Sequence, residues 1–174
     1  MATEMVQLLR PLPLFRTLTD DELGRLVDMG RLEYWQRGSV VLEQGAFGPR
    51  MMILVEGRVE VLRRDADGVH HAIATLGAGE VLGEISLLLD LPRCATARAV
   101  TPLRVFAMDK SAFQDLLDRE DTAALKFAVE VARALASRLI KLNDLVVALL
   151  AESEALKERF AAARQEAFPL WDEG

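Results

Sequence analysis

Hydrophobic and polar residues first recur with a helical period along this chain. Residues 19–22, Thr-Asp-Asp-Glu, have the order of a capping box, in which the threonine and the glutamate side chains each accept a backbone N–H group of the other residue. The apolar residues that follow fall on one helical face as far as Met29, and Gly30 is the expected C-cap. The pattern predicts a short helix here, after a stretch in which Pro11 and Pro13 prevent a long one.

From residue 32 the period of the pattern changes to two, which is typical of strands. The alternation predicts short strands, separated by glycine-bearing turns, at residues 32–36, 40–43, 51–56, 58–64, 70–76, 95–99 and 104–108. Asp67 and Gly68 are a favourable pair for a hairpin turn between two of these strands. Short strands at such regular spacing indicate a β-sandwich or barrel.

The last third of the chain is helical in pattern. Ser111 is expected to cap a short helix, and a second helix is expected to start at Asp121 or Thr122. No proline or glycine interrupts the second helix before Pro169. Its apolar residues recur as a heptad seam with one polar member, at Leu125, Ala128, Ala132, Leu135, Leu139, Leu142, Val146, Leu149, Ser153, Leu156, Phe160 and Ala163.

A helix over residues 121–166 would be on the order of 65 Å long at about 1.5 Å per residue. Such a helix could not pack entirely on one small β domain, so part of it is expected to meet a partner, and the seam predicts a homodimer. The alternative is a helix in two pieces, broken near Asn143 and Asp144, that folds back on the chain's own sheet.

Composition and charge limit the number of domains, the binding partners and the cellular compartment that we expect. The 174 residues, 51% of them hydrophobic, allow one domain with a real core and one appended element. We expect a β domain with N-terminal helices over residues 1–120, the long helix over 121–166 and a tail over 167–174. A net charge of −6 gives no electrostatic footprint for nucleic acid, and the apolar runs are too short to span a membrane. A single cysteine and an N-terminus without a signal-peptide pattern favour a reducing cytoplasm.

The residues with the most distinctive chemistry lie in residues 79–97. Gly83 permits a sharp turn, and the apolar run that begins there is long enough for one or two helical turns, whose free amides would attract an anion. Arg93 offers a guanidinium fork that matches phosphate oxygens. Glu84 would repel a phosphate unless it accepts hydrogen bonds from neighbouring hydroxyl groups. A phosphate with neighbouring hydroxyls indicates a nucleotide, whereas the plainer alternative is a loop with an incidental Glu and Arg.

This segment resembles the phosphate-binding cassette of the cyclic nucleotide-binding domain family, with its Gly-Glu-aliphatic-Ala/Ser-Leu start and Pro-Arg-Ala-Ala-Thr end. The resemblance implies a mainly β fold with flanking helices, a double-stranded β-helix (jelly-roll) followed by a long C-terminal helix. It implies that Glu84 binds the ribose 2′-hydroxyl, that Arg93 binds the cyclic phosphate, and that the amides of Ser86 and Cys94 complete the anion cradle. The full set of ligand-binding residues that it implies is Gly83, Glu84, Ile85, Ser86, Arg93, Cys94 and Thr96, with Ser137 and Arg138 on the long helix.

The resemblance also bears on which nucleotide is bound. Family members that prefer cGMP often have a threonine after the arginine, whereas Cys94 is a poor donor, so cAMP is favoured and cGMP remains possible. On the long helix, Ser137 and Arg138 match positions where hydroxyl residues contact the base, and only Ser137 keeps a hydroxyl. Many members have an acidic residue near residues 48–50, where this chain has Pro49, so the hydrogen bonding of that loop is expected to differ.

The function implied is a cyclic nucleotide sensor, a regulatory protein that acts through its C-terminal helix on a downstream protein still unknown. The family's bacterial transcription factors continue into a helix-turn-helix domain, for which residues 168–174 leave no room, and residues 111–174 hold twelve acidic against eight basic residues. A stand-alone sensor that does not bind DNA is therefore expected. The alternative is a scaffold protein that has kept the jelly-roll but lost ligand binding.

An enzyme is the least favoured reading of the sequence. Jelly-rolls also house metal-dependent oxygenases, but His70 and His71 are adjacent in a predicted strand and would point to opposite faces, and the chain has no other histidine. No metal site is expected. Cys94 has no histidine near it in sequence and lies in an apolar run of small residues, so a thiol in the core or in a pocket wall is expected rather than a nucleophile.

Overall fold

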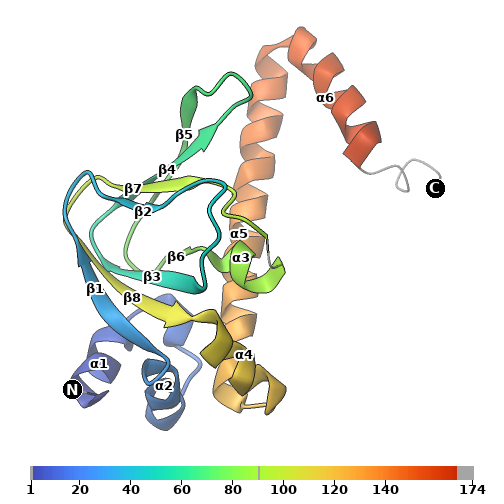
Figure 1. The fold of residues 1–174 in the computed structure, drawn as a ribbon. Helices are drawn as coiled ribbons and strands as arrows, with labels where there is room; N and C mark the ends of the chain where they lie inside the picture. The colour runs from blue at the N-terminus through green and yellow to red at the C-terminus, as the bar shows by residue number, and fades with distance from the viewer. Residues whose placement is uncertain (1, 90, 168–174) are drawn as a thin grey trace. The chain divides into compact units, whose positions relative to one another are not determined.

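Two antiparallel sheets form the centre of the structure, a computed structural model that describes residues 2–89 and 91–167 (Figure 1). The chain divides into a first unit, residues 1–134, and a second unit, residues 135–174. One sheet has the strand order β1-β8-β3-β6 and the other the order β2-β7-β4-β5. The strands are β1 (Gly30–Trp35), β2 (Val40–Leu42), β3 (Arg50–Glu56), β4 (Val59–Arg64), β5 (His70–Leu76), β6 (Val81–Leu82), β7 (Thr96–Ala99) and β8 (Leu103–Asp109).

The core of the first unit lies between the two sheets. Buried residues from both sheets form one hydrophobic cluster, with Met52, Leu54, Leu82, Val105 and Ala107 from one sheet and Val41, Val59, Leu76, Ala97 and Ala99 from the other. Neighbouring strands are rarely consecutive in sequence, which is the connectivity of a jelly-roll. The predicted fold class is confirmed. All seven predicted strands are present, and β6 was missed because a strand of two residues has no readable period.

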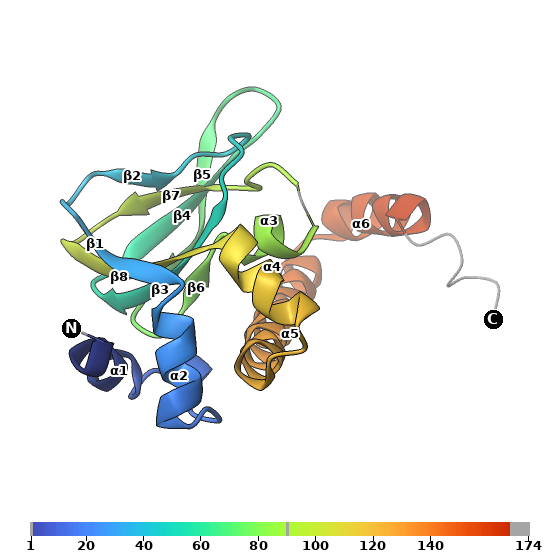
Figure 2. The same ribbon diagram turned by 60° about the horizontal axis from the view of Figure 1, so that its bottom comes forward.

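The helices are α1 (Ala2–Leu9), the 3-10 turn η1 (Pro13–Phe15), α2 (Asp20–Val27), α3 (Glu84–Leu89), α4 (Lys110–Asp118), α5 (Thr122–Glu152) and α6 (Glu154–Ala167). Figures 1 and 2 show α1 and α2 side by side at one end of the sheet that contains β1. The predicted capping box is present, since Thr19 N donates to Glu22 Oε2 at 2.7 Å and Glu22 N donates to Thr19 Oγ1 at 3.2 Å. No helix among the described residues is long and apolar enough to cross a membrane.

Two predicted helix ends are wrong. Helix α2 has Asp28 as its C-cap, and Gly30 instead begins β1, where an added Cβ would lie 2.4 Å from the carbonyl oxygen of Ala107. Glycine is needed there for a close approach of two chains rather than for a helix end. Helix α4 begins at Lys110 and not after Ser111, because the N-cap position is Asp109 at the end of β8.

The start of α5 packs on the N-terminal helices and on α4. The Phe127 ring stacks on Phe15 at 5.6 Å between centroids and meets the Phe113 ring edge-on at 5.7 Å. Lys126 Nζ donates to both carboxylate oxygens of Glu22, at 2.7 and 2.9 Å. An aromatic cluster and an ion pair therefore join residues far apart in the sequence at the start of α5.

Replacing Glu22 with glutamine is expected to destabilise the protein in a pH-dependent way. The hydrogen bond from Lys126 is the main cause that holds the pKa of Glu22 below its ordinary value of 4.5. A carboxylate with a lowered pKa stabilises the folded state above the pKa of the unfolded chain, and this stabilisation is lost as the pH falls through the folded pKa. Glu22→Gln keeps an acceptor for Thr19 N but removes the charge, so its Tm should be lower than that of the wild type at pH 7.

Circular dichroism melts between pH 7 and pH 3 measure this difference. The gap in Tm between wild type and Glu22→Gln should shrink as the pH falls from about 4.5 towards the lower pKa of the folded state, because the wild-type carboxylate is progressively protonated. Asp21→Asn is the matched control, since it removes an exposed charge from the same helical turn. A gap that stays constant over this pH range would mean that the Lys126 ion pair does not contribute.

The second unit consists of the remainder of α5 and α6. The predicted start of α5 is confirmed, because the helix begins at Thr122 and Asp121 Oδ1 accepts a hydrogen bond from Ala123 N at 2.8 Å. The 31-residue α5 is the predicted long C-terminal helix, and at about 1.5 Å per residue it is about 46 Å long. Residues 168–174, most of the predicted tail, lie outside the described residues.

The helical stretch does not run unbroken to residue 166, because Ser153 separates α5 from α6. The Ser153 hydroxyl accepts a hydrogen bond from Leu156 N at 3.3 Å and its carbonyl accepts one from Lys157 N at 3.2 Å, so this serine caps α6. Neither a continuous helix nor the alternative break near Asn143 and Asp144 is correct. The break coincides with the one polar member of the heptad seam.

Candidate functional site

Buried polar side chains gather in one short segment of the first unit. Among the described residues, four polar or charged side chains are buried: Glu22, Glu84, Arg93 and Thr96. The capping box and Lys126 account for Glu22. The other three lie in the segment that the sequence singled out, and each is less than 10% exposed. Because burying a charge is costly unless it is paired, this segment needs an explanation beyond packing.

Strand β6 and helix α3 meet at Gly83 and form the first half of the segment (Figure 1). Gly83 has a φ of +78°, a conformation that other residues rarely adopt. An added Cβ would also lie 2.2 Å from Nη1 of Arg93. The predicted sharp turn at this glycine is therefore present, and the group that lies against its main chain is the guanidinium of the same segment.

The Arg93 guanidinium donates to main-chain carbonyls on two sides. Nη1 donates to the carbonyl oxygen of Gly83 at 2.9 Å, whereas Nη2 donates to those of Gly48, at 3.2 Å, and Arg50. A guanidinium has five N–H donors, so three hydrogen bonds among the described residues leave two donors for a ligand. Burial lowers the pKa of Arg93 below its usual value, and the nearby Glu84 partly offsets this effect. Arg93 nevertheless stays a cation at neutral pH.

The main chain of Arg93 is also paired with the loop between β2 and β3. Gly45 N donates to the Arg93 carbonyl at 2.8 Å, and Arg93 N donates to the Ala46 carbonyl at 2.9 Å. Thr96 Oγ1 accepts a hydrogen bond from Gln44 N at 3.1 Å, which accounts for its burial. Hydrogen bonds of residues 44–46 therefore join this loop to residues 93–96 of the segment.

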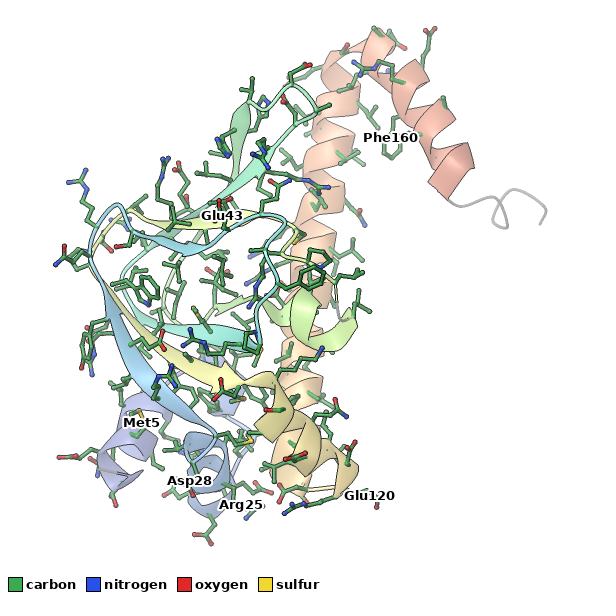
Figure 3. The ribbon with its side chains drawn as sticks, in the orientation of Figure 1. Met5, Arg25, Asp28, Glu43, Glu120 and Phe160 are labelled. Carbon is green, nitrogen blue, oxygen red and sulfur yellow. The ribbon has the colours of Figure 1, made fainter. Side chains whose placement is uncertain are left out.

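A cavity of about 240 Å³ lies beside Arg93, beneath the β2–β3 loop. It is lined by Val41, Leu42, Glu43, Ala46, Phe47, Gly48, Pro49, Arg50, Met52 and Arg93; Figure 3 labels Glu43. Of the nine residues predicted to bind a ligand, Arg93 alone is among these lining residues. Sequence reasoning missed the loop as a neighbour of Arg93, and the only signal of it was the unusual Pro49.

The other predicted residues of the first unit are placed as follows. Glu84, Ile85 and Ser86 lie on the six-residue α3, which confirms the expected helical turns, and Glu84 is buried close enough to Arg93 for the two charges to interact. Nothing is described of the Ser86 side chain. Cys94 is exposed in the bend before β7 begins at Thr96, so of the two expected positions for its thiol the core is wrong, and Cys94 is not among the residues that line the cavity. The assignment of these residues to a ligand stays a prediction.

Ser137 and Arg138 lie on the part of α5 that belongs to the second unit. Their assignment to the base of a nucleotide therefore stays a prediction as well. Across the described part of the chain, no group of three or more His, Cys, Asp or Glu side chains could hold a metal ion. His71 instead pairs with Asp65 across the β4–β5 hairpin, at 2.6 Å between Nε2 and Oδ2.

The sequence of this chain matches a known protein family. The family model of the cyclic nucleotide-binding domain matches residues 32–120. A cAMP-dependent protein kinase regulatory subunit from Eremothecium gossypii is 36% identical over 109 residues, which cover 63% of this chain and 23% of that protein. A cyclic AMP receptor protein from Thermus thermophilus is 29% identical over 143 residues, which cover 82% of this chain and 64% of that protein. This chain thus spans less than two thirds of either relative.

A solved structure shows the same fold. A cyclic nucleotide-binding domain from Methylobacillus flagellatus superposes with a TM-score of 0.74 at 22% identity, over 84% of this chain and 82% of that one. The Eremothecium gossypii relative is named as a regulatory subunit and the Thermus thermophilus relative as a receptor protein. Since the family model covers more than half of the 174 residues, the chain belongs to the cyclic nucleotide-binding domain family.

Proposed function

We propose that this protein is a cyclic nucleotide sensor whose ligand is cAMP. The observation that carries the proposal is the burial of Glu84, Arg93 and Thr96 within one segment that begins at a left-handed glycine. A buried cation with two N–H donors that have no partner among the described residues suits a phosphate. A buried carboxylate near that cation suits the hydroxyl groups of a ribose. These buried residues together suit a ligand that contains both a phosphate and a ribose, which is a nucleotide.

Within this proposal each residue has one task. Arg93 holds the cyclic phosphate, together with the backbone amides of Ser86 and Cys94, and Glu84 accepts from the ribose 2′-hydroxyl. Gly83 lets the chain turn closely enough for its carbonyl to hold the guanidinium. Thr96 supports the segment through Gln44 N, and its hydroxyl keeps a proton to donate.

The preference for cAMP rests on the residue after the arginine. Cys94 is exposed on the bend beside Arg93, where a thiol is a weak donor to a purine. Two relatives named for cAMP agree with this preference. cGMP is the alternative ligand, and direct competition between the two nucleotides for the purified protein distinguishes them.

The output of the sensor is proposed to pass through residues 121–166 to a protein partner in the cytoplasm, with the seam forming a homodimer. Large apolar side chains of the second unit support this proposal, because Leu139, Leu142, Leu149 and Phe160 of the seam are 44–58% exposed (Figure 3 labels Phe160). Exposed apolar residues in a row are typical of a surface that binds another helix.

Cyclic nucleotides are expected to raise the melting temperature of the protein. A ligand at about 100 times its Kd stabilises the folded state by roughly 2.7 kcal/mol, which for a chain of this size is a shift of about 5–10 °C. Differential scanning fluorimetry with cAMP, cGMP and 5′-AMP measures it, and cAMP should give the largest shift. 5′-AMP is the control, since it keeps the base and the ribose but not the cyclic phosphate.

A protein that shifts with none of the three nucleotides would overturn the sensor proposal. It would favour the scaffold alternative, in which the jelly-roll is kept and the guanidinium of Arg93 serves only its three carbonyls. Equal shifts with cAMP and 5′-AMP would place the binding energy outside the phosphate cradle.

A further inference from the structure

The loop that follows β2 meets Arg93 in a way that the sequence reasoning did not assign. The Gly48 carbonyl of this loop and the Arg50 carbonyl at the start of β3 accept both hydrogen bonds from Nη2, whereas Nη1 donates to the Gly83 carbonyl. We propose, on the basis of the proposed function, that residues 48–50 position the Arg93 guanidinium for the phosphate and that Gly48 is the positioning residue.

The direction of the effect follows from how residues 48–50 are anchored. Between the two carbonyls that face Arg93, the Pro49 carbonyl accepts a hydrogen bond from Lys110 N at 2.7 Å, at the start of α4. Pro49 also has a fixed φ. Arg50 begins β3, where it pairs with Asp109, and its side chain binds Glu33 of β1. The carbonyls are therefore held without Arg93, and it is the flexible arginine side chain that they orient.

Gly48 is the position where this arrangement depends on the absence of a side chain. A Cβ at Gly48 would lie 2.9 Å from Nη2 of Arg93, 3.5 Å from Nε and 3.6 Å from Cζ. The nearest atoms all belong to the end of a long side chain, so the guanidinium would move and the fold would be kept. Gly48 does not have the positive φ of its neighbour Gly45, so an alanine there adds no backbone strain.

Loss of this positioning is expected to weaken nucleotide binding without unfolding the protein. Gly48→Ala should weaken cAMP binding several-fold and Gly48→Val about tenfold, since a misplaced guanidinium loses part of a charge-assisted hydrogen bond. Calorimetry measures the affinities, and melts check the fold. Gly77→Ala and Gly77→Val are the matched controls, because a Cβ at Gly77 meets nothing within 4 Å and its φ is not positive.

A second background shows whether Gly48 acts through Arg93. A lysine lacks the planar fork that the two carbonyls hold, so in Arg93→Lys the further change Gly48→Ala should alter affinity by less than about twofold. If Gly48→Ala lowers cAMP affinity by the same factor in the wild type and in Arg93→Lys, Gly48 has a structural role and the proposal is overturned. Wild-type affinity in Gly48→Ala and Gly48→Val, with weaker binding in Arg93→Lys, would overturn it too and leave the proposed function intact.

A measurement without nucleotide tests the same proposal even if no cyclic nucleotide binds. Carbonyls on both sides of a guanidinium slow its rotation, so the Nη–H groups of Arg93 should give resolved NMR signals in the wild type and in Gly77→Ala. These signals should broaden or merge in Gly48→Ala. Unchanged Arg93 signals in Gly48→Ala and Gly48→Val would show that Gly48 does not hold the guanidinium in place.

Discussion

Arg93→Ala is expected to weaken cyclic nucleotide binding at least tenfold, and by more than Glu84→Ala does. Loss of a forked, charge-assisted contact should cost about 1.5–3 kcal/mol, and the phosphate charge is then left without its buried counter-charge. In the proposed site, Glu84→Ala would remove hydrogen bonds to a neutral ribose but also a negative charge near the phosphate, so its two effects should partly cancel. Isothermal calorimetry of both variants with cAMP measures the order.

The matched control for Arg93→Ala is Arg98→Ala, which removes an arginine from β7 whose partner is the surface carboxylate of Glu60, at 2.8 Å. Arg93→Ala should also lower the Tm, because three main-chain carbonyls lose a donor. Affinities are therefore compared well below the Tm of each variant. Equal cAMP affinities of the wild type and Arg93→Ala would remove Arg93 from the ligand site.

The sequence was most informative where local pattern and tertiary structure agree. The capping box at Thr19 and Glu22 and the helix start at Asp121 involve only neighbouring residues, so they are readable from the chain alone. Strands β3 and β8 are nearly continuous apolar runs in the sequence, and in the structure residues 51–55 and 105–108 are all buried. In contrast, Gly30 looked like a helix end. A glycine is needed at this position because the carbonyl of Ala107 lies against it, and no local pattern reveals a contact with a residue 77 positions away.

The same limit applies to the candidate site. The segment from Gly83 to Thr96 could be picked out because its glycine, carboxylate and guanidinium lie close together in sequence. The carbonyls of Gly48 and Arg50 could not be picked out from the sequence, because every residue has a main-chain oxygen whatever its type. Pro49 was a hint that the loop's hydrogen bonding differs, but which group replaces an acidic side chain is visible only in three dimensions. The core position considered for Cys94 was wrong, because β7 begins only at Thr96, one residue after the predicted start of the strand, and Cys94 lies exposed before it.

Ser153 shows a different kind of limit. In the heptad pattern it is one polar residue in an apolar seam, which coiled coils tolerate, so the pattern alone favours an unbroken helix. A serine is also a good N-cap, and in the structure that preference prevails, so α6 starts anew after it. In the proposed homodimer, the part of the seam before this break would be the stretch that pairs with the second copy.

Leu142→Glu is expected to dissociate the homodimer that the seam predicts, while the β domain stays folded. Leu142 is 56% exposed on α5, and in a symmetric pair of helices it would face its own copy, so the variant would bury two like charges against each other. A buried charge without a partner costs about 3 kcal/mol or more, which is over a hundredfold in Kd. Sedimentation velocity at micromolar concentration, with and without cAMP, measures the association.

Asn143→Glu is the control, because it adds the same charge at the next position, off the seam, and should leave the dimer intact. Val146→Glu, one turn further on, should act like Leu142→Glu. If nucleotide changes the dimerisation constant, dimerisation must change nucleotide affinity by the same factor, so calorimetry on Leu142→Glu gives an independent value of the coupling. A wild type that sediments as a monomer in both conditions would assign the exposed seam to a different protein partner and exclude a dimeric switch.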